Sequence, residues 1–317
     1  MSGEMNTHKR RALLASLLGG LALLAPPLLG AWIIYLSYQE PLPRLLAQPP
    51  RAALAVVERT EASCARDLFS LAGSGSNLVL TQRLAEAFQQ SHPGAPLRLH
   101  ESIGSAGGIR ATYDGVVDVG LVSRAFSAEE SRWNLKWIPY ARVAVVLATH
   151  PSVPDREISS ADLLRLYAGK KASWRDGKRA IVLQREVSDS SHQVVGAALP
   201  GFAEVNREAY LQERWKVLYS DAAMQRALLG IEGAVGLFDL GSIVSQGLAL
   251  NALALDGVAP GAQDVLTGRY PFVKPLAFAV APPLCPRIEQ WIRFVLSAPG
   301  QRLVAESGYL APAGESR

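Results

Sequence analysis

Three short stretches rich in glycine and serine, each directly before a predicted helix, constrain this chain more than any other feature. They are residues 73–77 (GSGSN), 104–108 (GSAGG) and 185–191 (REVSDSS). A helix N-terminus leaves backbone N–H groups without partners and carries a partial positive charge, so it favours a bound anion. Each stretch alone is typical of a turn with a helix cap, but three of them, one with an arginine, together predict a small-anion site.

The glycine spacing and the composition argue against several other functions. The chain contains no G-x-x-x-x-G-K-[ST] and no G-x-G-x-x-G followed by a well-placed acid, so a nucleotide is not predicted. Its 317 residues, 49% hydrophobic and 19% charged, can bury one or two domain cores. The net charge of +4 comes from scattered basic residues, which disfavours nucleic-acid binding. Five His and two Cys lack the spacing of metal ligands, so we expect no metal and no cofactor.

The hydrophobic pattern alternates between strands and helices. Residues 67–72 and 97–101 are predicted strands, and Leu80, Leu84 and Phe88 form the apolar face of the helix between them. Further strands are predicted at 116–122, 180–183, 234–238, 248–255 and 275–280, and helices from 159 and at 192–199, 222–229 and 288–295. This rhythm predicts an α/β fold with a mostly parallel sheet, in which the long apolar segment 137–149 can pass between two lobes.

The N-terminus predicts an extracytoplasmic protein. Residues 12–38 form an apolar run that is long enough to cross a bilayer and ends in interfacial aromatic residues. We expect this run to be an uncleaved transmembrane helix in the inner membrane, with residues 1–11 in the cytoplasm and 39–65 as a linker. The alternative is a signal peptide whose apolar core ends near Ala25, with cleavage near residues 29–31 and release to the periplasm.

Five segments in order carry a resemblance to a known family. They are LAGSGSNLVLTQRLAEAFQQSHPG, SIGSAGGIRATYDGVVDVGLVSR, QREVSDSSHQVV, EGAVGLFDLGSI and VLSAPGQRLVAESGYLAP. Together they resemble the periplasmic phosphate-binding proteins of bacterial ABC transporters, from about Asp67 to Pro312. The resemblance implies a two-lobed type II periplasmic-binding-protein fold over residues 66–317. It implies a first lobe of about 66–145 and 240–317, a second lobe of about 146–239, and lobe closure on an oxyanion.

The resemblance also implies a set of ligand-binding positions in this chain. From the glycine-serine loops and the end of the 116–122 strand, these are Ser76, Asn77, the backbone amide of Leu78, Ser105, Ser123, Arg124, Arg185, Asp189, Ser190 and Ser191. Asn77 stands where the family has Thr, and Asp189 where it has Ser. Ser123 stands where some relatives have an Asp that accepts the proton of hydrogen phosphate, so Asp189 is the alternative acceptor here.

Several of these positions have a second interpretation. Asp189 can instead be only the N-cap of the following helix. Arg124 can instead form a surface ion pair with Glu129 or Glu130, and Arg185 can be a solvated residue at a strand end. Ser190 or Ser191 beside His192 could suggest a nucleophile and base, but adjacent side chains at a helix start diverge, so we expect no enzyme.

The predicted function is reversible capture of an inorganic oxyanion, most favourably phosphate, for an ABC importer whose permease subunits are the partners. The alternatives are a membrane-tethered sensor or accessory protein, and a receptor for sulfate, molybdate or tungstate. Cys64 and Cys285 are the two cysteines. In an extracytoplasmic compartment two lone thiols often pair, and the family fold brings the ends of the first lobe together, so a disulfide is expected, with free thiols as the alternative.

Overall fold

A computed structural model describes Cys64 and residues 68–313, which belong to one compact unit. The predicted membrane helix at 12–38, the N-terminal segment 1–11 and the predicted linker, apart from Cys64, lie outside the described residues. Within 68–313 we find no helix with both the length and the apolar character needed to cross a bilayer.

The described residues form a large mixed sheet with the strand order β2-β1-β3-β11-β4-β8-β6-β7. Its strands are β1 (Phe69–Gly73), β2 (Leu97–Ser102), β3 (Val119–Val122), β4 (Lys136–Thr149), β6 (Ile181–Arg185), β7 (Lys216–Leu218), β8 (Ala234–Asp239) and β11 (Val273–Val280). β1 pairs in parallel with β2 and β3, and β6 pairs in parallel with β7 and β8. The predicted α/β fold is therefore confirmed, but the sheet is mixed and not mostly parallel, because β11 pairs antiparallel with β3 and β4, and β4 pairs antiparallel with β8.

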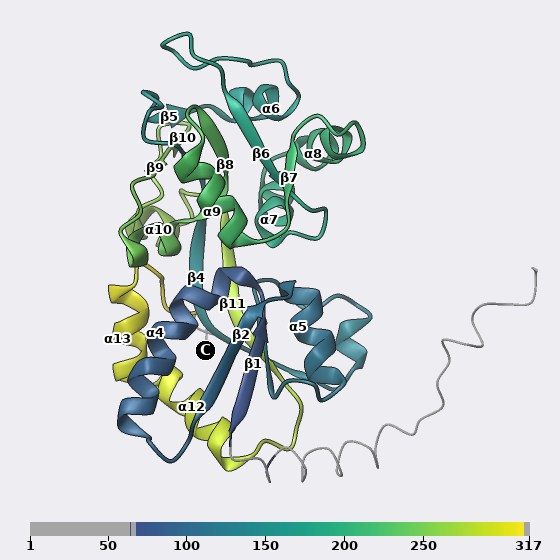
Figure 1. Cartoon of the computed structure of the whole chain (residues 1–317), viewed down its shortest axis with the longest axis vertical. Coiled ribbons are helices and arrows are strands. Elements are labelled where there is room, and N and C mark those ends of the chain that lie inside the picture. The colour runs from purple at the N-terminus through teal and green to yellow at the C-terminus, as the bar shows by residue number, and fades with distance from the viewer. Residues whose placement is uncertain (1–63, 65–67, 314–317) are drawn as a thin grey trace, which may run out of the picture. The chain divides into compact units, whose positions relative to one another are not determined.

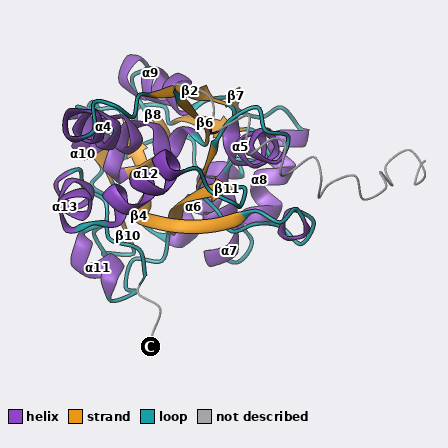
Figure 2. Cartoon of the chain, turned by 90° about the horizontal axis from the view of Figure 1, so that it is seen from below, coloured by secondary structure: helices purple, strands orange, loops and turns teal. Residues whose placement is uncertain are grey.

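The first hydrophobic cluster defines lobe 1, residues 68–143 and 274–313. Helices α4 (Gly75–Ser91), α12 (Pro286–Leu296) and α13 (Ala298–Glu306) pack on one side of β1 and β2, and α5 (Gly104–Tyr113) packs on the other side (Figures 1 and 2). The 3-10 turn η1 (Glu130–Arg132) precedes β4. The predicted stripe of Ile288, Trp291, Ile292 and Val295 is buried. The Trp291 ring packs at tilted or edge-on angles against Phe69, Phe88 and Phe278.

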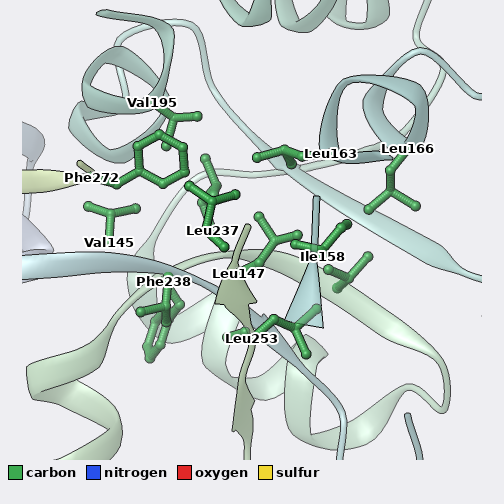
Figure 3. Packing of buried hydrophobic residues seen from close by; sticks show 14 of the residues in the cluster. Val145, Leu147, Ile158, Leu163, Leu166, Val195, Leu237, Phe238, Leu253 and Phe272 are labelled. Carbon is green, nitrogen blue, oxygen red and sulfur yellow. The ribbon is translucent and has the colours of Figure 1, made fainter. Parts of the chain in front are cut away.

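The second hydrophobic cluster defines lobe 2, residues 144–273 (Figure 3). Its helices are α6 (Ser160–Tyr167), α7 (Ser190–Ala198), α8 (Phe202–Leu211), α9 (Asp221–Gly230), α10 (Leu240–Gln246) and α11 (Ala262–Leu266). Short strands β5 (Glu157–Ile158) and β10 (Ala254–Leu255) pair with each other, and β9 (Asn251–Ala252) pairs with β4. Ser159 is the N-cap of α6, because its hydroxyl accepts from the Asp162 amide at 3.0 Å.

Strands β4 and β11 pass between the lobes (Figure 1). The first part of β4 pairs antiparallel with β11 in lobe 1, and residues Val145 to Thr149 pair with β8 in lobe 2. The prediction that 137–149 crosses between lobes is thus confirmed.

The return to lobe 1 was predicted at about residue 240, and the packing of the residues after this point bears on that boundary. Leu253, Leu255, Val265 and Phe272 pack in the cluster of lobe 2, and the chain returns through β11. The apolar run of β8 predicts a buried strand, but only its pairing with the lobe 2 half of β4 shows that it stays within this lobe.

A disulfide joins Cys64 to Cys285, the N-cap residue of α12, with the two Cα atoms 5.3 Å apart. The Arg287 guanidinium also donates a hydrogen bond to the carbonyl of Cys64. The expected pairing of the two cysteines is therefore present, and it ties Cys64 to lobe 1.

Candidate functional site

The three glycine-serine loops, far apart in sequence, line one pocket of about 270 Å³ between the lobes. Lobe 1 contributes the starts of α4 and α5, and lobe 2 contributes the end of β6, the start of α7 and the start of α9. The lining residues are Ser74, Gly75, Ser76, Ser102, Ile103, Gly104, Ser105, Ala106, Arg185, Glu186, Ser188, Asp189, Ser190, Tyr219 and Asp221.

The lobe 1 wall is built from two helix N-termini that lack side-chain caps. Neither Ser74, the N-cap residue of α4, nor Ile103, the N-cap residue of α5, makes a capping side-chain bond, and neither helix has an acidic residue in its first turn. Gly73 has a φ of 150°, and a Cβ there would lie 2.1 Å from the Leu121 carbonyl oxygen. Glycine is therefore required where β1 turns into α4. Among the first-turn N–H groups, that of Asn77 donates to the Ser74 carbonyl at 3.1 Å and that of Gly104 to Ser102 Oγ at 3.4 Å, and the uncapped helix starts can present the others to a ligand.

Ser123 lies at the centre of a group of serine hydroxyls. Its Oγ is 2.7 Å from Ser74 Oγ, 3.2 Å from Ser105 Oγ and 2.7 Å from Ser190 Oγ. The Ser123 amide also donates to Ser105 Oγ at 3.1 Å. Because Ser190 begins α7, this chain of hydroxyls connects the two lobes directly behind the pocket.

Lys274 on β11 is a site residue that the sequence interpretation missed. Its side chain is fully buried, and Nζ lies 2.7 Å from Asp239 Oδ1, 2.6 Å from Ser76 Oγ and 2.8 Å from Ser191 Oγ. Nζ is also 3.4 Å from Ser190 Oγ. A lysine directly before an apolar strand is normally interpreted as an exposed strand end. The only feature of the sequence that could have indicated a buried site residue was this charge next to the apolar strand 275–280.

Arg185 lies at the pocket wall among three carboxylates. Its Nε and Nη2 donate to Glu186 at 3.0 and 3.1 Å, and its Nη1 lies 3.5 Å from Asp189 Oδ2 and 3.3 Å from Asp221 Oδ2. Burial alone would lower the pKa of Arg185, but the charges of Asp221, Asp189 and Glu186 outweigh it and raise the pKa. Arg185 is thus a paired, buried cation and not a solvated residue at a strand end.

Asp189 is the N-cap of α7, as one of its two interpretations predicted. Its Oδ1 accepts from the amides of Ser191 and His192 at 3.1 and 3.0 Å, and lies 2.9 Å from His192 Nδ1. Burial opposes ionisation, but His192, Arg185 and Lys274 together hold the pKa of Asp189 below its ordinary value. Asp189 also lines the pocket, so it presents an ionised acceptor there while it caps the helix.

Five predicted positions are not part of the pocket lining, and three of them, Asn77, Leu78 and Arg124, have their contacts elsewhere. The Asn77 amide donates to the Val122 carbonyl at 3.3 Å and to the Tyr140 hydroxyl at 2.9 Å, and Leu78 packs against the lobe 1 core. Helical geometry turns Asn77 to the same buried face as Leu80 and Thr81. Arg124 instead forms the bidentate ion pair with Glu130, at 2.6 and 2.7 Å, that was its alternative interpretation.

The remaining predicted residues come together. Ser76, Ser105, Arg185, Asp189 and Ser190 line the pocket. Ser123 and Ser191 lie behind it, within hydrogen-bond distance of lining or buried site residues. The His192 ring bonds to Asp189 and approaches the Tyr167 hydroxyl at 3.4 Å, which leaves both ring nitrogens with partners other than the neighbouring serines.

Comparison with protein-family models identifies residues 58–299 as a PBP superfamily domain. The chain belongs to this superfamily. Among curated PBP relatives, the phosphate-binding protein PstS of Bacillus subtilis (strain 168) is 26% identical over 210 residues, which cover 64% of this chain and 66% of that protein. The alignment therefore spans just under two thirds of that relative. PstS of Borreliella burgdorferi is 21% identical over 220 residues, covering 67% of this chain and 78% of the relative.

Solved PBP structures share the fold. A phosphate ABC transporter substrate-binding protein with bound phosphate from Clostridium perfringens superposes with a TM-score of 0.69 at 23% identity, covering 77% of this chain and 99% of that chain. The periplasmic molybdate-binding protein of Azotobacter vinelandii superposes with a TM-score of 0.56 at 14% identity, covering 77% and 99%. At these identities the likeness establishes the two-lobed fold alone.

Proposed function

We propose that this protein is an extracytoplasmic receptor that binds an inorganic oxyanion, with phosphate as its ligand, and delivers it to an ABC importer. One observation carries the proposal: two uncapped helix N-termini and serine hydroxyls face Arg185 and ionised Asp189 across a pocket between lobes. The names of the curated relatives support phosphate. The proposal places the importer's permease subunits as partners and assigns no enzymatic activity.

Binding would proceed by closure of the lobes around the anion. Backbone amides of α4 and α5 with Ser76 and Ser105 donate from lobe 1, and Arg185 with Ser190 donates from lobe 2. Each lobe alone leaves the anion partly hydrated, so ligand binding favours the closed arrangement. Gly75 permits this approach, because a Cβ on it would lie 2.0 Å from Asp221 Oδ2 of lobe 2.

Asp189 supplies the basis for choosing phosphate over sulfate. Hydrogen phosphate carries a proton that it can donate to a carboxylate, whereas sulfate has none at neutral pH. A buried carboxylate facing an oxygen without a proton is an unmatched acceptor, which costs about 1–3 kcal/mol or more. The Oδ1 atom of Asp189 accepts from three donors, so Oδ2, which lies 3.5 Å from Arg185 Nη1, is the atom assigned to this role.

A second candidate is a receptor for another tetrahedral oxyanion such as sulfate, molybdate or tungstate. The observation that favours it is the serine at position 123, which is buried and hydrogen-bonded to three other serines and so adds no carboxylate to the pocket. A membrane-tethered sensor remains the alternative to transport, and it depends on the predicted helix at 12–38.

Calorimetric titration of the full chain with phosphate, sulfate, molybdate and tungstate tests the proposal. We expect phosphate to bind and sulfate to bind more weakly. Preference for sulfate or molybdate would support the second candidate. If none of the four anions gives a heat of binding, the proposed oxyanion function is overturned.

A further inference from the structure

The buried Lys274 occupies an unusual position, at the point where β11 passes between the lobes. It pairs in register with Val143, the last lobe 1 residue of β4. Its ammonium group contacts Ser76 of lobe 1 and Ser190, Ser191 and Asp239 of lobe 2. Two of these serines, Ser76 and Ser190, line the anion pocket, whereas Lys274 does not. Lys274 therefore reaches the pocket only through hydroxyl groups.

We propose that Lys274 is a positioning residue that keeps Ser76 in the pocket lining and Ser191 directly behind it as hydrogen-bond donors, so that the pocket prefers unprotonated oxyanion oxygens. This inference rests on the proposed oxyanion function. It assigns to Lys274 an effect on affinity and selectivity without contact with the anion.

The chemistry of the two groups gives the hydrogen bonds their direction. An ammonium group has three N–H donors and no acceptor, and a hydroxyl group has one hydrogen and two lone pairs. The three N–H groups match the three shortest contacts of Nζ, to Ser76, Asp239 and Ser191, and Ser190 at 3.4 Å lies farther away. A serine that is bonded to Nζ accepts from it. Its single hydrogen then remains to be donated elsewhere, either to a neighbouring acceptor or to a bound anion.

Asp239 reinforces the same direction at Ser76. The Asp239 carboxyl is buried, which raises its pKa, while Lys274 and a hydrogen bond from Ser76 act in the opposite sense. Ser76 thus accepts from Lys274 at 2.6 Å, and its own hydrogen is left to be donated. When an anion enters, that hydrogen can turn to it while Asp239 keeps its 2.7 Å contact with Lys274.

The arrangement places serine donors in the same pocket as Asp189, which is one of three lining carboxylates together with Glu186 and Asp221. Serines held by Lys274 offer hydrogens, and ionised Asp189 is the acceptor for a single protonated oxygen. Hydrogen phosphate has three unprotonated oxygens and one protonated oxygen, which suits serine donors together with the Asp189 acceptor. Loss of Lys274 would let the same hydroxyls rotate to accept, and the donor set would become mixed.

The test uses the full chain with Lys274→Met combined with Asp239→Asn, so that no buried carboxylate is left without its cation. We expect this double variant to fold and to bind phosphate about tenfold more weakly, the scale of one charge-assisted hydrogen bond. Lys171→Met is the matched control, because Lys171 pairs with Asp162 away from the pocket. The control should bind phosphate as the unmodified chain does.

A double-mutant cycle separates positioning from a purely structural role. If Lys274 acts through Ser76, then Ser76→Ala should weaken phosphate binding severalfold in the unmodified chain and have little effect in the Lys274→Met/Asp239→Asn background. Equal effects of Ser76→Ala in both backgrounds, or unchanged phosphate affinity in the folded double variant, would overturn the inference. Absence of anion binding by the unmodified chain would overturn the proposed function itself, so the two failures are distinguishable.

Discussion

Two buried cations lie at the anion site, and their surroundings differ in kind. Lys274 is surrounded by serine hydroxyls and one carboxylate, whereas Arg185 is surrounded by three carboxylates, Glu186, Asp189 and Asp221. The Lys274 side chain lies behind the lining, and the Arg185 side chain forms part of it. A positive charge near an anion site can therefore act in two ways. It can orient hydroxyl donors that bind the anion, or it can bind the anion directly once the carboxylates paired with it have moved.

The two side-chain types suit these roles. A compact ammonium donates three separate hydrogen bonds, and Lys274 divides them between both lobes. A guanidinium is a flat fork that pairs with carboxylates in two directions at once, as Arg185 does with Glu186. An anion that reaches Arg185 must therefore compete with the carboxylates that already contact it. Arg185 can donate fully to the anion only when these carboxylates move away.

Removing the charge of Lys274 should give the largest change in stability. Lys274→Met alone leaves Asp239 buried without its cation, and we expect the free energy of unfolding to fall by about 3–5 kcal/mol. Urea denaturation followed by circular dichroism measures this. Adding Asp239→Asn should recover most of the loss. A single variant as stable as the unmodified chain would show that the pair contributes nothing to folding.

Removing the charge of Arg185 should give the largest loss of phosphate affinity. Arg185→Met removes the charged donor and leaves three carboxylates facing the anion, so we expect phosphate binding to weaken by about 100-fold or more. Calorimetry measures the change. Arg124→Met is the matched control, because Arg124 pairs with Glu130 outside the lining and should alter stability without altering affinity. Equal affinity in the Arg185 variant, with the protein folded, would show that the pocket has been misplaced.

The Arg124–Glu130 pair gives a reference for an arginine held by one carboxylate. The hydrogen bonds from Arg124 hold the pKa of Glu130 below its ordinary value. Its stabilisation is therefore complete above the unfolded pKa of about 4.3 and is lost as the pH falls through the lower folded pKa. We expect Glu130→Gln to destabilise by about 1–2 kcal/mol at pH 7. The difference should shrink on acidification below about pH 4.3. A pH-independent difference in unfolding free energy would contradict this assignment.

Removing one hydroxyl from the lobe 1 wall shows how much a neutral donor contributes to binding relative to Arg185. Ser105 lines the pocket, and its Oγ also accepts from the Ser123 amide. Ser105→Ala should weaken phosphate binding by about 1 kcal/mol, the scale of one neutral hydrogen bond. Calorimetry should therefore show a much smaller loss of phosphate affinity for Ser105→Ala than for Arg185→Met. A loss as large as that of the arginine would mean that the hydroxyls, and not Arg185, dominate binding.

The smallest expected effect is a gain. Asp221 Oδ2 lies 3.3 Å from Arg185 Nη1, so Asp221→Asn should free part of the guanidinium charge and strengthen phosphate binding by about 0.5–1 kcal/mol. Asp264→Asn, which disrupts a pair with the exposed Arg269, is the matched control and should leave affinity unchanged. Weaker binding in the Asp221 variant would show that this carboxylate helps to place Arg185.

Local signals account for much of the fold. The 3.6-residue stripe of Ile288, Trp291, Ile292 and Val295 predicted α12, and the spacing of Ser159 and Asp162 predicted the N-terminus of α6. The glycine-serine loops predicted where three helices start. These features depend on neighbours within a few residues, so the sequence contains them in full. The return of the chain to lobe 1 depends on which strand pairs with which half of β4, and that is a long-range choice.

The same division holds at the site. The local pattern was enough to predict that glycine, serine, Arg185 and Asp189 stand at helix starts, where backbone donors and short polar side chains gather. Long-range packing sets the other contacts: Asn77 turns to the core, Arg124 pairs with Glu130, and Lys274 lies beneath the pocket. The physical reason is that the partners of a charged or amide side chain are set by segments far away in sequence. Lys274 and Ser76 are 198 positions apart, and no local pattern records that they meet.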